Sequence, residues 1–299
     1  MQSSDQHPRV EPISTESILQ GHYASPGIRE KIQAGLEVLG QTTSTVTPGE
    51  LKMMDEFHMG GAPAAMHVLQ AMGFTEQDTV LDVGCGVGGT TRSLAANFRV
   101  SSIEGVDLTP EYIQVGTEIN TWPLVKASFQ GGVVPRLTQG SALALPFPEA
   151  SFSKIIMLHV GMNVEDKAQL FKEFRRVLKP GGTVGVFDVM RTGHGELPFP
   201  MPWSSVAETS FVQTPEAYKL AMSEAGLTVL REENRREAIM EALAKQLQNA
   251  TDVGSPKNPL SLGILMGNSF PQKGQNIGTM TRAGIIAPVF VVAAARGLL

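Results

Sequence analysis

A cluster of glycines follows a short apolar segment near residue 80. Residues 80–83 read Val-Leu-Asp-Val, and Gly84, Cys85 and Gly86 come directly after them, with a third glycine at Gly89. Glycine lets a chain turn sharply and approach a ligand closely, because it has no Cβ. A strand that passes through such a turn into a helix is typical of nucleotide-type binding sites. The spacing therefore predicts a cofactor-binding loop at residues 84–86.

Asp82 places a carboxylate inside that apolar segment, just before the turn. The pattern Gly-x-Gly-x-x-Gly by itself also suits a dinucleotide-dependent dehydrogenase, and this alternative stays open. A carboxylate at this point would repel the phosphates of a dinucleotide, whereas a ligand with positive charge would be attracted to it. Asp82 therefore favours a cationic cofactor without phosphate.

A second carboxylate, Asp107, ends the next apolar segment, residues 100–106. Ligands of open α/β sheets bind in the crevice at the carboxyl ends of the strands, and a carboxylate there can accept hydrogen bonds from both hydroxyls of a ribose. Asp107 could instead cap the helix that follows Pro110. Thr109 is already a suitable cap, so we favour the ribose contact.

The hydrophobic pattern predicts the elements that must position these residues. Strand-like segments alternate with helical stretches, the best marked of which spans about 164–178 with Asn163 as its N-cap. Such alternation predicts an α/β fold, a Rossmann-like, mostly parallel seven-stranded sheet with helices on both faces. The predicted strands are residues 79–83, 100–106, 136–139, 154–159, 183–189, 227–231 and 285–293.

Two kinds of additional segment surround this predicted sheet. Residues 1–72 are expected to form an N-terminal helical segment and lid, with two short helices within 16–39, before a cofactor-binding domain of residues 73–299. The Pro- and Gly-rich stretch 191–211 interrupts the alternation, as does 235–282, which reads as two helices and a loop. We expect both stretches to form cap insertions over the sheet edge.

Composition excludes several function classes. The chain has 299 residues, 42% of them hydrophobic, and a formal net charge of -5, with Lys and Arg scattered among acidic residues, so we expect no nucleic-acid partner. Cys85 is the only cysteine, so an internal disulfide is impossible and we expect no metal site. No stretch is apolar enough for a membrane span, and the polar first residues favour a cytoplasmic protein without a membrane partner. The oligomeric state stays open.

Several motifs together carry a family resemblance. Besides the glycine loop, an acidic residue closes the second predicted strand within residues 105–109. Residues 139–147 end in Leu-Pro-Phe, and residues 178–182 contain a Lys-Pro-Gly-Gly turn. In this order and spacing the chain resembles the class I S-adenosylmethionine-dependent methyltransferases. It is most similar to their small-molecule branch, which includes enzymes of ubiquinone and menaquinone pathways and of the sarcosine/dimethylglycine type. The resemblance implies S-adenosylmethionine as the cofactor, whose ammonium and sulfonium suit an acidic site.

The same resemblance implies a set of cofactor contacts. One position departs from the family pattern: Ser141 stands where the family usually has Asp, so the contact to the adenine amino group is expected to be weaker or to come from the backbone. The expected cofactor-binding residues are Asp82, Gly84, Cys85, Gly86, Asp107, Leu108, Ser141, Ala142 and Leu158. Cys85 is interpreted as a small packing residue rather than a reactive thiol.

Two histidines are candidates for catalysis. His159 ends the fourth predicted strand, which faces the transferred methyl group in the family that the chain resembles, so a general base or a substrate ligand is expected there. A histidine held only by packing is the alternative. His58 lies before a Gly-Gly hinge, in a segment that resembles the cofactor-covering N-terminus of small-molecule methyltransferases. We expect it to be a lid or substrate contact, and an ordinary loop histidine is the alternative.

The acceptor wall is expected on the loop after the fifth strand. Three prolines stiffen residues 198–203 and present Phe199 and Trp203, which we interpret, with Met162, as an apolar substrate-facing wall. A rigid loop packed on the core is the alternative. Further polar candidates are Asp188, His194 and Glu208.

The sequence thus predicts transfer of a methyl group to a small, largely apolar molecule, a displacement in which the protein mainly aligns the reactants and a base is optional. It does not choose between N, O and C nucleophiles. A nicotinamide-dependent oxidoreductase and a non-catalytic cofactor-binding module stay as alternatives.

Overall fold

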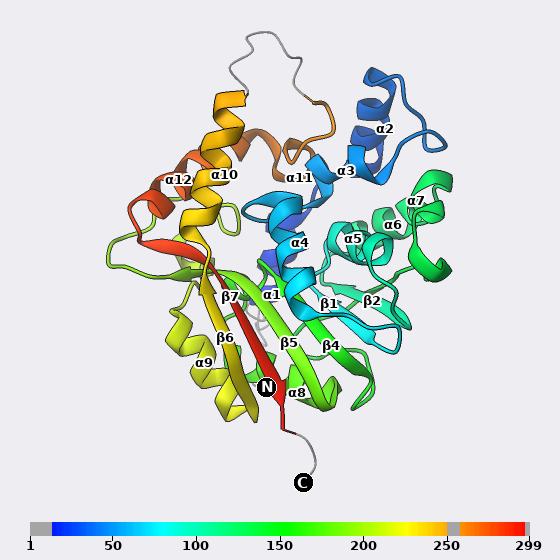
Figure 1. Cartoon of the computed structure of the whole chain (residues 1–299). Helices are drawn as coiled ribbons and strands as arrows, with labels where there is room; N and C mark the ends of the chain where they lie inside the picture. The colour runs from blue at the N-terminus through cyan, green and yellow to red at the C-terminus, as the bar shows by residue number, and fades with distance from the viewer. Residues whose placement is uncertain (1–13, 250–257, 297–299) are drawn as a thin grey trace, which may run out of the picture.

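The computed structural model describes residues 14–249 and 258–296. Within these ranges, seven strands form one sheet in the order β3-β2-β1-β4-β5-β7-β6 (Figure 1). Neighbouring strands from β3 to β5 are parallel, whereas β7 runs antiparallel to both β5 and β6. The predicted mostly parallel sheet is therefore confirmed. The strands are β1 (Thr79–Val83), β2 (Ser102–Asp107), β3 (Arg136–Gln139), β4 (Phe152–Leu158), β5 (Leu178–Arg191), β6 (Leu227–Asn234) and β7 (Ile286–Ala295).

Every predicted strand overlaps an observed one, and the largest difference is at the start of β5. β5 begins at Leu178 rather than at residue 183, because Leu178 pairs with Phe152 before an irregularity in the β4 register. The Pro-Gly-Gly turn therefore lies within the extended segment rather than before it.

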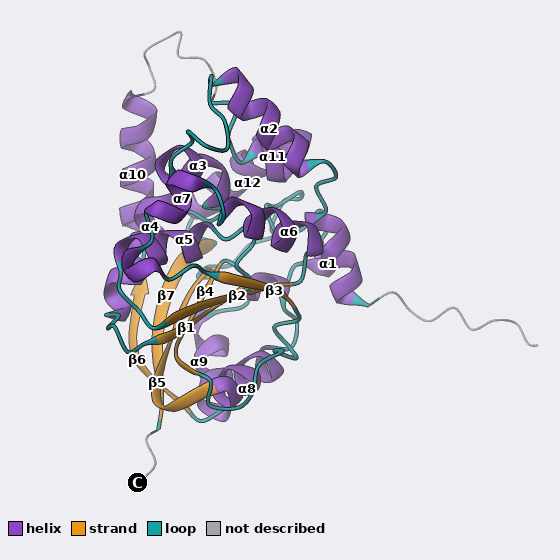
Figure 2. Cartoon of the chain, turned by 90° about the vertical axis from the view of Figure 1, so that its right-hand side faces the viewer, coloured by secondary structure: helices purple, strands orange, loops and turns teal. Residues whose placement is uncertain are grey.

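Helices cover both faces of the sheet, as predicted (Figure 2). Successive strand residues point to opposite faces, so Val80 packs beneath α4 (Gly61–Met72), α5 (Gly89–Asn97) and α6 (Pro110–Ile119). Its neighbour Leu81 packs against α8 (Lys167–Val177) and α9 (Pro215–Glu224) on the other face. The short α7 (Pro123–Ala127) follows α6.

The predicted helix near residues 164–178 exists, but the predicted N-cap residue, Asn163, is wrong. The cap is Asp166, whose carboxylate accepts a hydrogen bond from the Gln169 backbone N–H at 2.8 Å. Asn163 lies in a preceding 3₁₀ turn and hydrogen bonds to Tyr23 instead, because the N-terminal segment reaches this edge of the sheet.

Further helices gather beyond the carboxyl ends of the parallel strands (Figure 1). The two helices predicted within 16–39 are confirmed as α1 (Thr15–Tyr23) and α2 (Ile28–Val38), and α3 (Pro48–Asp55) follows them. From the later part of the chain come α10 (Arg236–Asn249), α11 (Gly263–Met266) and α12 (Phe270–Arg282). No helix in residues 14–249 and 258–296 combines the length and apolarity that crossing a membrane requires.

Candidate functional site

A cavity of about 1080 Å³ lies at the carboxyl ends of β1, β2 and β4. It brings together twelve of the fourteen residues predicted as catalytic, cofactor or substrate contacts, from segments far apart in the chain. The predicted residues that line it are His58, Asp82, Gly84, Cys85, Gly86, Asp107, Leu108, Ala142, Leu158, His159, Met162 and Trp203. Ser141 and Phe199 are not in the lining, and neither are Asp188, His194 and Glu208.

The glycine loop has two differently constrained positions. Gly84 and Gly86 both have positive φ, 75° and 55°. A Cβ on Gly84 would come within 2.1 Å of the Val160 side chain, so that glycine is required by packing. A Cβ on Gly86 would meet no protein atom within 4 Å, although Gly86 lines the cavity. Gly86 is therefore the loop position whose missing side chain leaves room for a ligand.

Asp107 fixes the loop as well as facing the cavity. Its Oδ2 accepts a hydrogen bond from the Gly86 backbone N–H at 2.9 Å, and its Oδ1 accepts one from Thr109 at 2.8 Å. Burial raises the pKa of the carboxyl group, and these hydrogen bonds oppose the rise. Each carboxylate oxygen can accept a further bond, so a ribose contact is compatible with this structural role.

An acidic cluster occupies the β1 side of the cavity. Asp82 is buried and its Oδ2 has no hydrogen-bond partner among the described residues. Burial, together with the charges of Glu56 and Asp107, raises its pKa to about 8. Glu56 accepts hydrogen bonds from Ser93 at 2.7 Å and Thr90 at 3.3 Å, and burial raises its pKa too.

Arg92 and Lys52 lie near this acidic cluster, but among the described residues neither forms an ion pair with Asp82 or Glu56. The Arg92 guanidinium lies 2.7 Å from the carboxylate of Asp55, the residue before Glu56. Within the described residues Asp82 and Glu56 therefore have no Lys or Arg ion-pair partner, although the charges of Arg92 and Lys52 oppose the rise in the pKa of Glu56. Burial of two such carboxylates is unfavourable unless a cation joins them. The cluster can accept a ligand ammonium.

His159 has both ring nitrogens engaged. Its Nε2 accepts a hydrogen bond from the Met59 backbone N–H at 3.2 Å, and its Nδ1 donates to the Phe187 carbonyl oxygen at 3.2 Å. Burial, and to a smaller extent His58, holds its pKa well below the ordinary value. The residue has a φ of 55°, which turns the side chain toward these partners. His159 is thus a neutral clamp between the end of β4 and the loop before α4.

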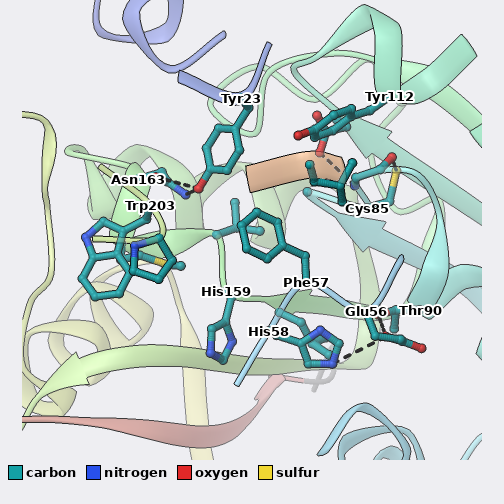
Figure 3. A pocket seen from close by; sticks show the side chains of 18 of the residues that line it. Tyr23, Glu56, Phe57, His58, Cys85, Thr90, Tyr112, His159, Asn163 and Trp203 are labelled. Atoms are coloured by element: carbon teal, nitrogen blue, oxygen red, sulfur yellow. Dashed lines mark hydrogen bonds and ion pairs between the residues drawn. The ribbon is translucent and has the colours of Figure 1, made fainter. Parts of the chain in front are cut away.

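His58 lies beside this clamp, with its ring centroid 5.9 Å from that of His159 (Figure 3). Its Nε2 is 3.5 Å from Glu56 Oε2 and has no hydrogen-bond partner in the described chain. Burial lowers its pKa to about 4, against the opposing charge of Asp55. Both histidines are therefore neutral near pH 7.

Replacing His159 by Ala should loosen the loop that it clamps. Loss of this side-chain acceptor for the Met59 amide removes one hydrogen bond, worth about 0.5–1.5 kcal/mol, so amide exchange in residues 57–60 should quicken about 2- to 10-fold. Hydrogen-exchange mass spectrometry measures this. His67→Ala, which removes a half-exposed histidine on α4 paired with Glu233, is the matched control. Unchanged exchange in the His159 variant would contradict the clamp.

Of the remaining predicted residues, some line the cavity and others lie in the core. Trp203 lines the cavity but is 1% exposed, with its indole N–H donated to Ser210 Oγ at 2.9 Å, so it is also a core residue. Phe199 is half-buried and packs against the small apolar cluster that contains Trp203, Met162 and Met201. Cys85 is buried, and burial raises its pKa well above the ordinary value, which disfavours a reactive thiolate. Asp188 is fully buried and accepts a hydrogen bond from Tyr218 at 2.6 Å.

Sequence reasoning missed the parts of the site that other segments supply. Glu56 comes from the end of α3, and Glu16 and Tyr23 come from α1. Much of the apolar wall comes from the late helices and the turns beside them. Its residues are Leu243, Leu262, Leu265, Met266, Phe270 and Ile277.

Comparison with known proteins agrees with this site. A family model described as "Methyltransferase domain" matches residues 81–186. The chain is 39% identical to 2-methyl-6-phytyl-1,4-hydroquinone methyltransferase of Synechocystis over 110 residues, which are 37% of this chain and 31% of that protein. The chain thus spans about a third of the length of that curated relative.

Solved structures share the fold over most of the chain. Phosphoethanolamine N-methyltransferase 2 of Haemonchus contortus, in complex with S-adenosyl-L-methionine, has a TM-score of 0.65 at 20% identity and covers 96% of this chain and 61% of its own. The cyclase SpnF has a TM-score of 0.62 at 15% identity, over 95% and 98% of the two chains. The fold alone therefore does not set the chemistry. Residues 81–186 thus match a methyltransferase domain, and the chain shares its fold with a solved S-adenosyl-L-methionine-bound N-methyltransferase.

Proposed function

We propose that this protein transfers a methyl group from S-adenosylmethionine to a small, largely apolar acceptor. The observation that carries the proposal is that one cavity joins three features: an acidic pair, Asp82 and Glu56, with no Lys or Arg ion-pair partner in the described chain, a glycine loop with open space at Gly86, and an apolar wall. The cofactor supplies an electrophilic methyl group on a sulfonium. The chain's own residues then need to bind, align and exclude water.

The cofactor's polar groups match the residues around the cavity. Asp82 and Glu56 suit its ammonium, and Asp107 suits its ribose hydroxyls. A dinucleotide would bring phosphates against the same carboxylates, which disfavours the nicotinamide-dependent alternative. Gly84, Cys85, Leu108, Ala142 and Leu158 complete the predicted contacts.

We assign the acceptor to the apolar part of the cavity lining, which includes Met162, Trp203 and residues of the late helices. Pockets of this kind bind ligands mainly through buried apolar surface, with few polar groups fixing the orientation. Similar proteins are named as methyltransferases of a phytyl hydroquinone, of sterols and of phosphoethanolamine, and the first two names describe bulky apolar molecules. We therefore favour an acceptor with a ring or chain of that character, and His58 as the polar group nearest the reaction.

The segment before β1 acts as a lid in this account. The proposed division is an N-terminal segment at residues 1–72 and a cofactor-binding domain at 73–299 with caps near 191–211 and 235–282, of which residues 1–13, 250–257 and 297–299 lie outside the described structure. Within the described residues, the contacts of α1, α3 and the loop at 57–60 with the cavity support this division.

The proposal is tested by incubating the purified chain with methyl-labelled S-adenosylmethionine and a panel of apolar acceptors that carry a phenol, an amine or an activated carbon. Transfer of label to at least one class, with S-adenosylhomocysteine as product, is expected. Cofactor binding without transfer to any of them would favour the non-catalytic module. The same assay in the Gly86 variant described below gives the background rate.

Cofactor binding should strengthen as pH rises toward about 8. In the free protein Asp82 holds a proton below that pH, and a bound ammonium favours the ionised carboxylate, so binding must release the proton. Affinity for S-adenosylhomocysteine should increase by up to about tenfold per pH unit and then level off. Titration calorimetry in buffers of different ionisation enthalpy measures the released proton directly. Asp82→Asn should remove the part of the pH dependence that levels off near pH 8, and a wild-type affinity independent of pH would contradict this role.

A further inference from the structure

Residues on one face of helix α1 line the cavity. Glu16, Gln20 and Tyr23 follow one another at helical spacing, so they lie on the same side of α1. Gln20 donates a hydrogen bond to the Leu108 carbonyl oxygen at 3.0 Å, and Tyr23 donates to the Asn163 side chain at 3.2 Å (Figure 3). The helix is thereby anchored over the ends of β2 and β4, and Glu16 reaches the loop after β3.

Glu16 meets Ser141 at that loop. The Ser141 hydroxyl donates its single hydrogen to Glu16 Oε1 and accepts a hydrogen bond from the Leu143 backbone N–H at 3.0 Å. Ser141 therefore has no proton left for a ligand. Glu16 lines the cavity whereas Ser141 does not, and a carboxylate can accept several bonds at once. The acidic function that the family resemblance places at position 141 is thus present here on another element.

The order of the strands sets which part of the cofactor comes near Glu16. The acidic cluster lies at β1 and Asp107 at the end of β2, and β3 follows on the far side of β2. A cofactor with its ammonium at β1 and its ribose at Asp107 must extend its base toward the loop after β3. Adenine carries an exocyclic amino group that donates hydrogen bonds. We propose that Glu16 accepts a hydrogen bond from this amino group and selects adenine as the base; this rests on the proposed function.

The test compares S-adenosylhomocysteine with its deaminated inosine analogue by titration calorimetry on the whole chain. Wild type should bind the adenine compound about tenfold more tightly or better, because a hydrogen bond to a charged group distinguishes the two. Glu16→Ala should lose this preference. Adding Ser141→Asp to Glu16→Ala should restore it, since the carboxylate then returns at the other partner of the observed contact. Glu37→Ala, at an exposed position of α2, is the matched control.

The outcomes separate the two proposals. A clear preference in wild type that disappears in Glu16→Ala and returns in the double variant supports the assignment. An equal affinity of wild type for both compounds, or a preference unchanged in Glu16→Ala, overturns it while leaving the methyltransferase proposal intact. Failure of wild type to bind S-adenosylhomocysteine at all would instead refute the proposed function.

Discussion

Gly86→Leu should abolish binding of S-adenosylhomocysteine while leaving the protein folded. A Cβ at this position meets no protein atom within 4 Å, and because Gly86 lines the cavity a larger side chain there enters the space that a ligand needs. The residue's φ of 55° costs a leucine about 1–2 kcal/mol, which a folded domain of this size can tolerate. Affinity should fall by about 100-fold or more, equivalent to about 2.7 kcal/mol. Calorimetry on the folded variant, checked by its thermal unfolding, measures the loss.

A glycine elsewhere with matching geometry separates backbone strain from ligand exclusion. Gly131 also has a positive φ, 64°, with no atom within 4 Å of an added Cβ, but it does not line the cavity. Gly131→Leu should therefore lose similar stability and keep its affinity. Gly84 is a poorer test, because its Cβ would collide with Val160 and disturb the fold itself. Normal binding by folded Gly86→Leu would show that the loop does not hold the cofactor.

Asp107→Ala should weaken cofactor binding by about 1.5–3 kcal/mol, or roughly 10- to 150-fold, the usual contribution of hydrogen bonds to a charged group. The variant also deprives the Gly86 and Thr109 backbone N–H groups of their acceptor, so the free energy of unfolding should fall by about 1–3 kcal/mol. Calorimetry and denaturant unfolding measure the two effects separately.

Asp78→Ala provides the comparison for Asp107. Asp78 accepts hydrogen bonds from the Thr75 backbone and from Ser153, just before β1 and away from the cavity. Its loss should lower stability without changing the affinity for S-adenosylhomocysteine. If Asp107→Ala behaved in the same way, with affinity reduced less than about threefold, the carboxylate would be structural and the ribose assignment would fail.

Local sequence patterns predicted the sheet and the residues that line the cavity at the ends of β1 and β2. The glycine loop, Asp82 and Asp107 lie within a single strand-turn-helix pattern and the strand after it, so short-range signals were sufficient. Helix α3 was missed although it begins with a readable signature. Thr47 precedes Pro48, and Glu50 accepts a hydrogen bond from the Thr47 backbone N–H at 2.7 Å.

The rest of the site depends on contacts between distant segments. His159 is engaged by Met59, one hundred residues earlier, and nothing near either residue in the sequence indicates that pairing. The same holds for Glu56 beside Asp82 and for Glu16 at Ser141, because these contacts join the N-terminal helices to strand ends that are distant in the sequence. Trp203 shows a further limit: the proline-rich segment predicted an apolar wall, and the structure places its indole both at the cavity and in the core.

The most direct test of the account is one calorimetric competition on the wild-type chain, titrated first with S-adenosylhomocysteine and then with NAD. We predict a single saturable site for S-adenosylhomocysteine, with heat that disappears in Gly86→Leu and persists in Gly131→Leu. NAD should neither bind nor displace it, since its phosphates would face Asp82 and Glu56. Tight binding of NAD, or no binding of S-adenosylhomocysteine to the folded chain, would contradict the account.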